Sequence, residues 1–351
     1  MALSGCRFVL LTYFVLRGLT ASADEFSVAP PGTFSVAVIP DTQQYRGGSS
    51  KAEPQSTAPV TNAVFAAYVD WIVDNLDRQR IVFVSHVGDI VDINRSDQWG
   101  VAREMMDRLH GRVPYGISVG NHDMTSAGDS SLFQQYFPAS RFESFPWYGG
   151  CFTPADRPPG TSGNNANSFQ LVTAEGIDLL FLHLECNAPD DVLAWADGVL
   201  AGYGDRLAIV TSHMGLGPRD RPQQASDYFD APKGRMTWKK CHGVRGNTPE
   251  QMWQKCFRNH PNLVMTCCGD QSRSQALHQT SRGDGGNAVH ELLSDYGSNG
   301  LRVMRFVPDE GRIEVRTWNP LEDHFCRETK IVPDESQHQF ELELTVLQPQ
   351  P

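Results

Sequence analysis

The sequence predicts an α/β fold, in which strands and helices alternate along the chain. Short apolar runs that suit buried strands alternate with longer stretches whose apolar residues recur at helical spacing. With 351 residues, of which 40% are hydrophobic and 20% charged, the chain can bury a large core. It contains no internal repeat and no linker long enough to divide it, so we expect one large domain.

Two strand–helix units are predicted before residue 124. Their apolar runs are bounded by turn residues, and the second helix has Ser96 or Asp97 as its expected cap. The strands are expected at residues 33–40, 80–89 and 113–123, and the helices at residues 61–79 and 96–111.

The C-terminal half is expected to continue the pattern with two hairpins, two further strands and one helix. The helix begins with Thr248, Pro249 and Glu250, which supply a cap, a first-turn proline and an acid at the positive dipole end. The hairpins are expected at 167–185 and 299–320, the strands at 206–215 and 262–269, and the helix at 248–259. Residues 217–247 are polar and irregular, which indicates an insertion near the site.

The N-terminal residues have the layout of a secretory signal. Arg7 precedes an apolar run from Phe8 to Leu19, and the small residues Ala21, Ser22 and Ala23 follow it. We therefore expect a signal peptide at 1–23, a folded domain at 24–320 and a C-terminal tail at 321–351. The protein would be secreted or extracytoplasmic, without a membrane span after cleavage; an uncleaved anchor is the alternative.

Charge and cysteine content limit the possible partners. Loss of Arg7 and Arg17 with the signal changes the net charge from −11 to −13, which argues against a nucleic-acid groove. Seven of the eight cysteines would remain, so at least one thiol lacks an intramolecular partner. Cys241 and Cys256 flank a short segment and are expected to form a disulfide. The sequence contains no CxxC pair that would indicate a zinc knuckle.

Polar residues at the ends of five predicted strands carry the functional prediction. Each has an ordinary structural alternative, such as a turn, a helix cap or a buried histidine. In an α/β sheet, however, the carboxyl ends of strands line the crevice where ligands bind, so these side chains can converge. Converging oxygen and imidazole donors predict a divalent-metal site. The residues are Asp41 and Gln43, Asp89 and Asp92, Asn121 with His122 and Asp123, Ser212 with His213, and Asp270 with Ser272.

The order and spacing of these motifs over residues 34–318 resemble the calcineurin-like metallophosphoesterases. The resemblance implies a two-metal phosphoesterase built on two packed mixed β-sheets flanked by helices. By position, Asp41 and Gln43 would bind the first metal ion, Asp89 would bridge both ions, and Asn121 and His213 would bind the second. His122 would protonate the leaving oxygen and be oriented by Asp92.

Two motifs depart from the usual family pattern. Gln43 replaces the commoner histidine, as in an exported branch of the family that opens with aspartate-threonine-glutamine, and the stretch Glu291–Tyr296 fits that branch too. The last family motif, Gly-His-x-His, is replaced by Gly269 followed by Asp270, Gln271 and Ser272. We expect Asp270 to bind the second metal ion and Ser272 to be a poor ligand.

Three alternatives remain open. The altered loop could mark a noncatalytic metal-binding or ligand-binding relative on the same fold. His278 could substitute as a ligand, whereas His86 and His183 are expected to be packing or supporting residues. The stretch 233–243, with Trp238 among several cations, could contact a phosphate or a sugar-like leaving group, or be a solvated loop.

The predicted function is thus an exported phosphoesterase that uses two divalent metal ions, and Mn, Mg, Ca, Zn and Fe are the candidates. The substrate would be a small-molecule, glycan, lipid or nucleotide phosphomonoester or phosphodiester.

Overall fold

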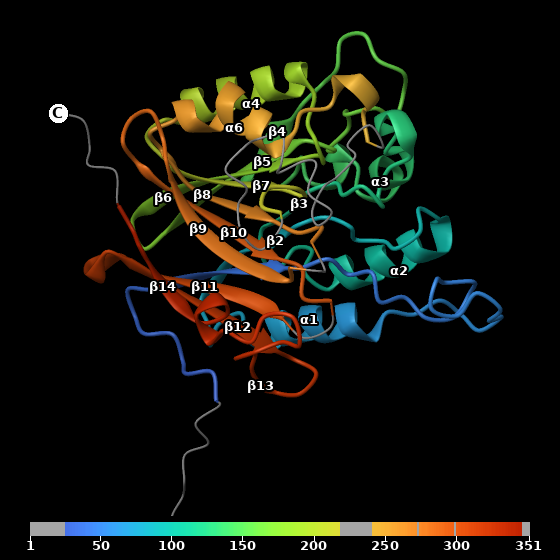
Figure 1. Ribbon diagram of the computed structural model, residues 1–351, viewed down its shortest axis with the longest axis horizontal. Coiled ribbons are helices and arrows are strands. Elements are labelled where there is room, and N and C mark those ends of the chain that lie inside the picture. Colours follow the sequence, from blue (N-terminus) through green and yellow to red (C-terminus); the bar gives the residue numbers. More distant parts are fainter. Residues whose placement is uncertain (1–24, 218–240, 272–273, 298–299, 346–351) are drawn as a thin grey trace, which may run out of the picture.

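Two mixed β-sheets pack face to face between layers of helices, as Figure 1 shows for the computed structural model. The structure describes residues 25–217, 241–271, 274–297 and 300–345. Within that part of the chain, helices α1 (Ala63–Asp74) and α2 (Ser96–Asp107) cover one sheet. Helices α4 (Asp190–Gly202) and α6 (Pro249–Lys255) cover the other. The short helix α3 (Ser131–Tyr136) packs beside α2.

The first sheet has the order β13-β12-β11-β1-β2-β3, with β14 pairing with β12. Strands β1, β2 and β3 are parallel, whereas β11 and β12 form an antiparallel hairpin beside β1. The strands are β1 (Phe34–Ile39), β2 (Ile81–His86), β3 (Tyr115–Ile117), β11 (Leu301–Val307), β12 (Arg312–Asn319), β13 (His324–Phe325) and β14 (Phe340–Glu343).

The second sheet has the order β4-β5-β6-β7-β8-β10-β9, with a parallel centre of β6, β7, β8 and β10. Antiparallel strands flank this centre at both edges. The strands are β4 (Tyr148–Cys151), β5 (Ser168–Ala174), β6 (Ile177–Leu184), β7 (Leu207–Ser212), β8 (Leu263–Cys268), β9 (Ala276–Arg282) and β10 (Ala288–Ser294).

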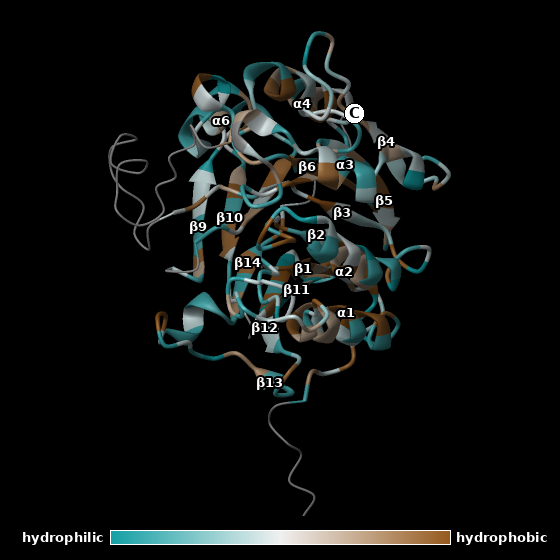
Figure 2. Cartoon of the chain, turned by 90° about the vertical axis from the view of Figure 1, so that its right-hand side faces the viewer, coloured by the Kyte–Doolittle hydropathy of each residue, from teal (hydrophilic) through white to brown (hydrophobic). Residues whose placement is uncertain are grey.

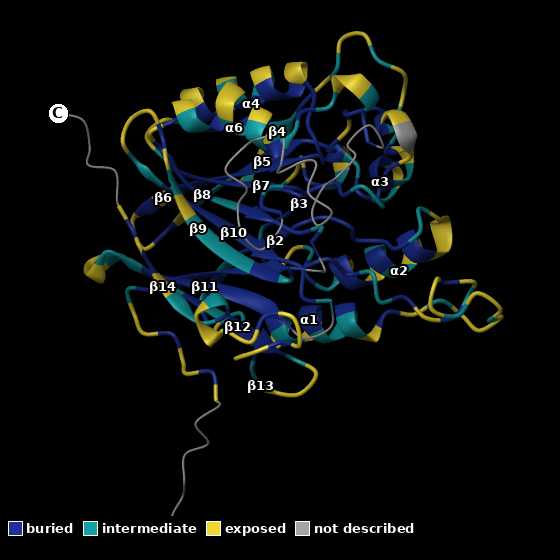
Figure 3. Ribbon diagram, in the orientation of Figure 1, coloured by how far each residue is buried: buried dark blue, intermediate teal, exposed yellow. Residues whose placement is uncertain are grey.

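The core between the sheets is apolar and includes stacked aromatic rings. Phe83 of β2 stacks on Phe181 of β6 with ring centroids 3.7 Å apart, which joins the two sheets. Two further clusters lie beneath the helices, one under α1 and α2 and the other under α4 and α6. Figures 2 and 3 show the same arrangement, with buried apolar strands inside and exposed polar residues on the outer helical faces.

The predicted α/β fold of two mixed sheets flanked by helices is confirmed. The expected hairpins form, and the turn of β5–β6 lies at Glu175 and Gly176, both with positive φ. Helix α2 begins at Ser96, but its N-cap is Arg95 and no side chain caps it, so neither Ser96 nor Asp97 has the expected role.

Residues beyond Pro320 are not the separate tail expected from the sequence. Strands β13 and β14 add to the first sheet, and Leu342 of β14 is buried in the core between the sheets. The described part of this segment therefore belongs to the domain. Among all the residues that the structure describes, no helix has the length and apolar character needed to cross a bilayer.

The strand directions place five loop segments at one edge of the sandwich. The parallel strands β1, β2 and β3 end there, and so do β7 and β8 of the facing sheet. Residues that directly follow these strands can therefore meet although they lie far apart in the sequence.

Candidate metal centre

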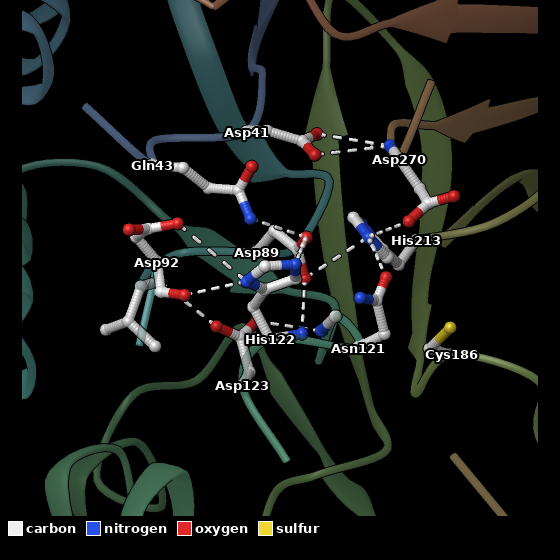
Figure 4. A network of polar contacts seen from close by, with 12 residues as sticks. Asp41, Gln43, Asp89, Asp92, Asn121, His122, Asp123, Cys186, His213 and Asp270 are labelled. Atoms are coloured by element: carbon white, nitrogen blue, oxygen red, sulfur yellow. Dashed lines mark hydrogen bonds and ion pairs between the residues drawn. The ribbon is translucent and has the colours of Figure 1, made fainter. Parts of the chain in front are cut away.

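Loops from both sheets bring Asp41, Asp89 and His213 together at this edge, as Figure 4 shows. One donor atom of each residue lies within 4.8 Å of the donor atoms of the other two. All three side chains are buried. Two carboxylates and an imidazole at these separations could share a metal ion.

His213 is held with one nitrogen directed at the site. Its Nδ1 donates a hydrogen bond to the Val87 carbonyl, at 3.0 Å. This fixes the tautomer and leaves Nε2 facing three oxygens: Asp89 Oδ1 at 3.2 Å, Asn121 Oδ1 at 3.2 Å and Asp270 Oδ1 at 3.4 Å. Metal-binding histidines are characteristically oriented by such a bond from the remote ring nitrogen.

The backbone around the site adopts conformations that are costly elsewhere. Asp89 and Asp270 have φ values of 49° and 62°, in the left-handed region that non-glycine residues rarely occupy. At Gly269, an added Cβ would lie 2.0 Å from Asp41 Oδ1. Only glycine therefore allows this loop to approach the Asp41 carboxylate.

Buried negative charge dominates the electrostatics. Burial raises the pKa of Asp41 well above its usual value, and the nearby Asp295 and Asp89 raise it further. Burial also raises the pKa of Asp270. Burial alone would lower the pKa of His213, but Asp89 and Asp41 reverse that effect and hold it well above its usual value. The excess of carboxylates over imidazole favours a cation at this position.

Asp270 lies on the His213 side of the site. Its backbone N–H donates to Asp41 Oδ2 at 3.2 Å, and its second carboxylate oxygen, Oδ2, accepts from Gln271 Nε2 at 2.8 Å. The structure thus brings Asp270 to the place expected from the sequence, and its metal-binding role stays a prediction. Ser272 lies outside the described residues.

Gln43 also reaches the site. Its Nε2 donates to Asp89 Oδ2 at 2.9 Å, so its amide lies against the carboxylate expected to bridge the two ions. The amide oxygen is the atom with which Gln43 could bind a metal ion.

His122 lies next to this group and is held by backbone and side-chain contacts. Its N–H donates to Asp89 Oδ1 at 2.8 Å, and its ring Nδ1 donates to the Asp92 carbonyl at 2.7 Å. Nε2 is then the free ring nitrogen, 4.0 Å from Asp89 Oδ2. The Asp92 carboxylate is farther, 3.9 Å from Nδ1, and accepts instead from Lys51 Nζ at 2.6 Å. Asp92 therefore orients the ring mainly through its main chain.

Two residues support the loops of the site: Asp123, which was among the strand-end residues named from the sequence, and Gln98, which was not. The Asp123 carboxylate accepts from the backbone N–H groups of Gly120 at 2.7 Å and Val91 at 3.1 Å, which joins two site loops. The Gln98 side chain accepts from the Asp92 N–H at 2.8 Å. Asp123 stands within the Gly-Asn-His-Asp stretch, which offered a signal for it, whereas nothing local in the sequence marks Gln98.

Asp295 and Lys51 are two further residues that sequence reasoning missed. Asp295 follows β10 and is buried, and burial together with Asp270 raises its pKa to about 8. Lys51 reaches the site from the loop after β1 and is half-exposed. Asp295 lies within the stretch Glu291–Tyr296. Nothing in the pattern of that stretch indicated that Asp295 would lie beside residues from other strands.

The remaining sequence candidates lie elsewhere. His86 and His183 are buried and hydrogen-bonded to Thr42 and Ser85, which fits the expected supporting role, and burial lowers the pKa of each to about 3. His278 is not a ligand, because it lies on β9 and stacks on Phe340 with centroids 3.9 Å apart. Most of the stretch 233–243, including Trp238, lies outside the described residues.

The expected Cys241–Cys256 disulfide does not form in the structure. The seven cysteines in the described part of the chain are free thiols. Cys241 Sγ lies 3.6 Å from Cys186 Sγ, whereas Cys256 ends α6 beside Asp197 and His260. Closeness in sequence misled the prediction, because the chain at residue 241 runs alongside the end of β6 rather than beside the end of α6.

The chain is similar to several known proteins. A curated relative, the uncharacterized protein YvnB of Bacillus subtilis, is 26% identical over 295 residues, which is 80% of this chain and 20% of YvnB. This chain therefore spans about a fifth of that relative's length. The purple acid phosphatase PPD1 from yellow lupin matches with a TM-score of 0.51 and 14% identity, over 90% of this chain and 55% of PPD1.

A 5′-nucleotidase precursor from Thermus thermophilus is also similar, with a TM-score of 0.45 and 13% identity over 78% of this chain and 51% of its own. The family model for the calcineurin-like phosphoesterases matches residues 34–245, which contain every site residue described above except Asp270 and Asp295. The sheet order, the strand-end loops and this match agree, and the chain belongs to the calcineurin-like phosphoesterase family.

Proposed function

We propose that this protein is an exported metal-dependent phosphoesterase that hydrolyses a phosphomonoester or phosphodiester with two divalent metal ions. The observation that carries the proposal is the convergence of oxygens from Asp89, Asn121 and Asp270 on His213 Nε2, all at 3.2–3.4 Å. One ring nitrogen can donate only one proton, so three oxygens gathered around it exceed what a hydrogen bond needs and fit a shared cation.

The donor set fits two adjacent ions. Asp89 lies between the groups and offers both carboxylate oxygens, so it would bridge them. Asp41 and Gln43 would bind the first ion, and Asn121, His213 and Asp270 would complete the second. Oxygen donors predominate, which suits Mn²⁺, Mg²⁺ or Ca²⁺, while Zn²⁺ and Fe remain chemically compatible through His213.

The first ion would have few protein ligands. The carboxylate of Asp295 would add a negative charge near it. Apart from burial, the charge of Asp295 has the largest influence on the pKa of Asp41, which supports a role for Asp295 at the expected first site. A negative charge there would favour retention of a cation even without a histidine ligand.

Chemistry at such a centre would divide between the ions and the chain. Bound divalent ions supply Lewis acidity and a lowered pKa for water. His122, protonated at Nε2, would donate a proton to the leaving oxygen, because its Nδ1 is committed to the Asp92 carbonyl. Asp89 accepts a hydrogen bond from the His122 backbone N–H. This bond would hold the proposed acid, His122, at a constant distance from the proposed bridging ligand, Asp89.

The candidate substrates are small-molecule, glycan, lipid and nucleotide phosphoesters. Generic phosphate esters test the reaction for all four classes. The full chain would be stripped with a chelator, reloaded with each divalent ion, analysed for metal content and assayed on p-nitrophenyl phosphate and bis-p-nitrophenyl phosphate.

We expect hydrolysis of at least one ester, and loss of both metal and activity in Asp89→Asn. The exposed substitution Asp205→Asn is the matched control, because it makes the same chemical change away from the site. Protein that binds metal but hydrolyses neither ester would favour the noncatalytic relative. Protein that binds no metal would refute the metal centre.

A further inference from the structure

Cys186 and Cys241 form a buried pair of thiols beside the candidate metal centre. Their sulfur atoms lie 3.6 Å apart, although the residues are 55 positions apart in the sequence. Both side chains are almost fully buried, with exposures of 0% and 1%. Figure 4 shows Cys186 next to Asn121.

The two chain segments are held together independently of the sulfurs. Asn187 Nδ2 donates to the Asn247 carbonyl at 2.7 Å, and the Asn247 N–H donates to the Asn187 carbonyl at 3.2 Å. Next to the thiols, His242 Nε2 lies 3.6 Å from Glu185 Oε2, and both of these side chains are buried. The fold therefore brings the thiols together even before any covalent bond forms.

We propose that Cys186 and Cys241 form a disulfide in the mature protein. The two thiols would transfer two protons and two electrons to a small-molecule or protein disulfide, whose S–S bond is cleaved to give two thiols as the Cys186–Cys241 bond forms. The sulfurs need to approach from 3.6 Å to about 2.05 Å, a change that side-chain rotation can supply when the backbone is already aligned.

The disulfide would be connected to the metal centre by a backbone hydrogen bond. The Cys186 N–H donates to the Val119 carbonyl at 2.7 Å, two residues before Asn121. A covalent link at Cys186 would thus fix the end of β6 against the loop that presents Asn121. The proposal rests on the export included in the proposed function but not on the hydrolysis, because the disulfide can form whether or not the site hydrolyses an ester.

The direct test is peptide mapping of the full chain from an oxidising secretory host. Free thiols would be blocked with N-ethylmaleimide under denaturing conditions, and the digest analysed by mass spectrometry without reductant. We expect a cross-linked peptide pair containing Cys186 and Cys241, lighter by two hydrogen atoms than the sum of its parts. Recovery of both residues with the maleimide label, or of Cys241 linked to Cys256, would overturn the proposal.

Variants separate the covalent bond from mere contact. Cys256→Ser should keep the cross-link, whereas Cys186→Ser and Cys241→Ser should each remove it. Reductant should lower the melting temperature of the parent by roughly 5 °C and leave the double variant Cys186→Ser/Cys241→Ser unchanged. If a serine variant fails to fold, the parent's own change with reductant still decides, and an unchanged melting temperature there counts against the disulfide.

Discussion

Replacing Asp295 with asparagine should make the metal-free protein more stable at neutral and alkaline pH. Burial and the neighbouring Asp270 raise the pKa of Asp295 to about 8, whereas an unfolded aspartate titrates near 3.9. Below pH 4 the carboxyl is protonated in both states and does not affect stability. Between these pKa values the unfolded state ionises while the folded state keeps its proton, so rising pH favours unfolding.

The size of the effect follows from that interval. Each unit of pKa difference is worth about 1.4 kcal/mol, so the full cost above pH 8 is about 6 kcal/mol and the cost at pH 7 is about 4 kcal/mol. Asparagine keeps an oxygen to accept the backbone hydrogen bond from Gln271 but cannot ionise. In chelator, Asp295→Asn should therefore match the parent near pH 4 and exceed it progressively up to pH 8.

Urea unfolding at several pH values in the presence of chelator measures this difference directly. Asp205→Asn, the same substitution at an exposed position, is the control for a general effect of net charge. Saturating Mn²⁺ should narrow or reverse the gain, because an ion nearby stabilises the ionised Asp295 of the parent. Parallel pH profiles of parent and Asp295→Asn in chelator would refute the assignment of a buried, protonated carboxyl.

The remaining predictions concern the proposed ligands, the proposed acid and export. Asp270→Ala should lose the second metal ion and most hydrolysis while Ser272→Ala changes little; metal analysis after dialysis against a weak chelator would show full retention if Asp270 is only a turn residue. His122→Asn should lower turnover by roughly 10²–10⁴-fold on alkyl phosphate esters, and less with good leaving groups. Its metal content should barely change, and equal rates on an alkyl ester would remove His122 from the mechanism. Lys51→Met should alter the pH profile of the reaction by releasing the Asp92 carboxylate, and an unchanged profile would make Lys51 a surface residue. Intact-mass measurement of the secreted protein should show a chain beginning near Asp24, and a detergent-extracted chain beginning at Met1 would contradict cleavage.

Most of the candidate site could be predicted because its residues directly follow strands. Asp41, Asp89, Asn121 and His213 stand where an apolar strand ends, and parallel strands place their carboxyl ends at one edge. The position of a ligand on such an edge depends little on loop conformation. The prediction extended to Asp270 for the same reason, since it follows β8.

Residues that reach the site from longer loops could not be predicted in this way. Lys51 stands within a loop that joins β1 to α1, so its contact with Asp92 depends on a path that no local pattern encodes. Asp295 approaches only because β10 pairs with β8, and strand order is a tertiary property. The Cys186–Cys241 contact likewise arises from packing between distant segments.

Exchange of imidazole for carboxylate at residue 270 alters more than one ligand. Four carboxyl groups, those of Asp41, Asp89, Asp270 and Asp295, are buried or nearly buried near the imidazole of His213, and His122 lies beside Asp89. Without cations, burial and mutual repulsion raise the pKa values of Asp41, Asp270 and Asp295. Binding of divalent ions would then release protons, so metal affinity should rise with pH over the interval in which metal-free stability falls. A centre richer in histidine would couple to pH through imidazoles that titrate near 6.5, so its metal affinity would level off above about pH 7. The carboxylates of this centre therefore make both the free energy of unfolding and the metal affinity depend on pH.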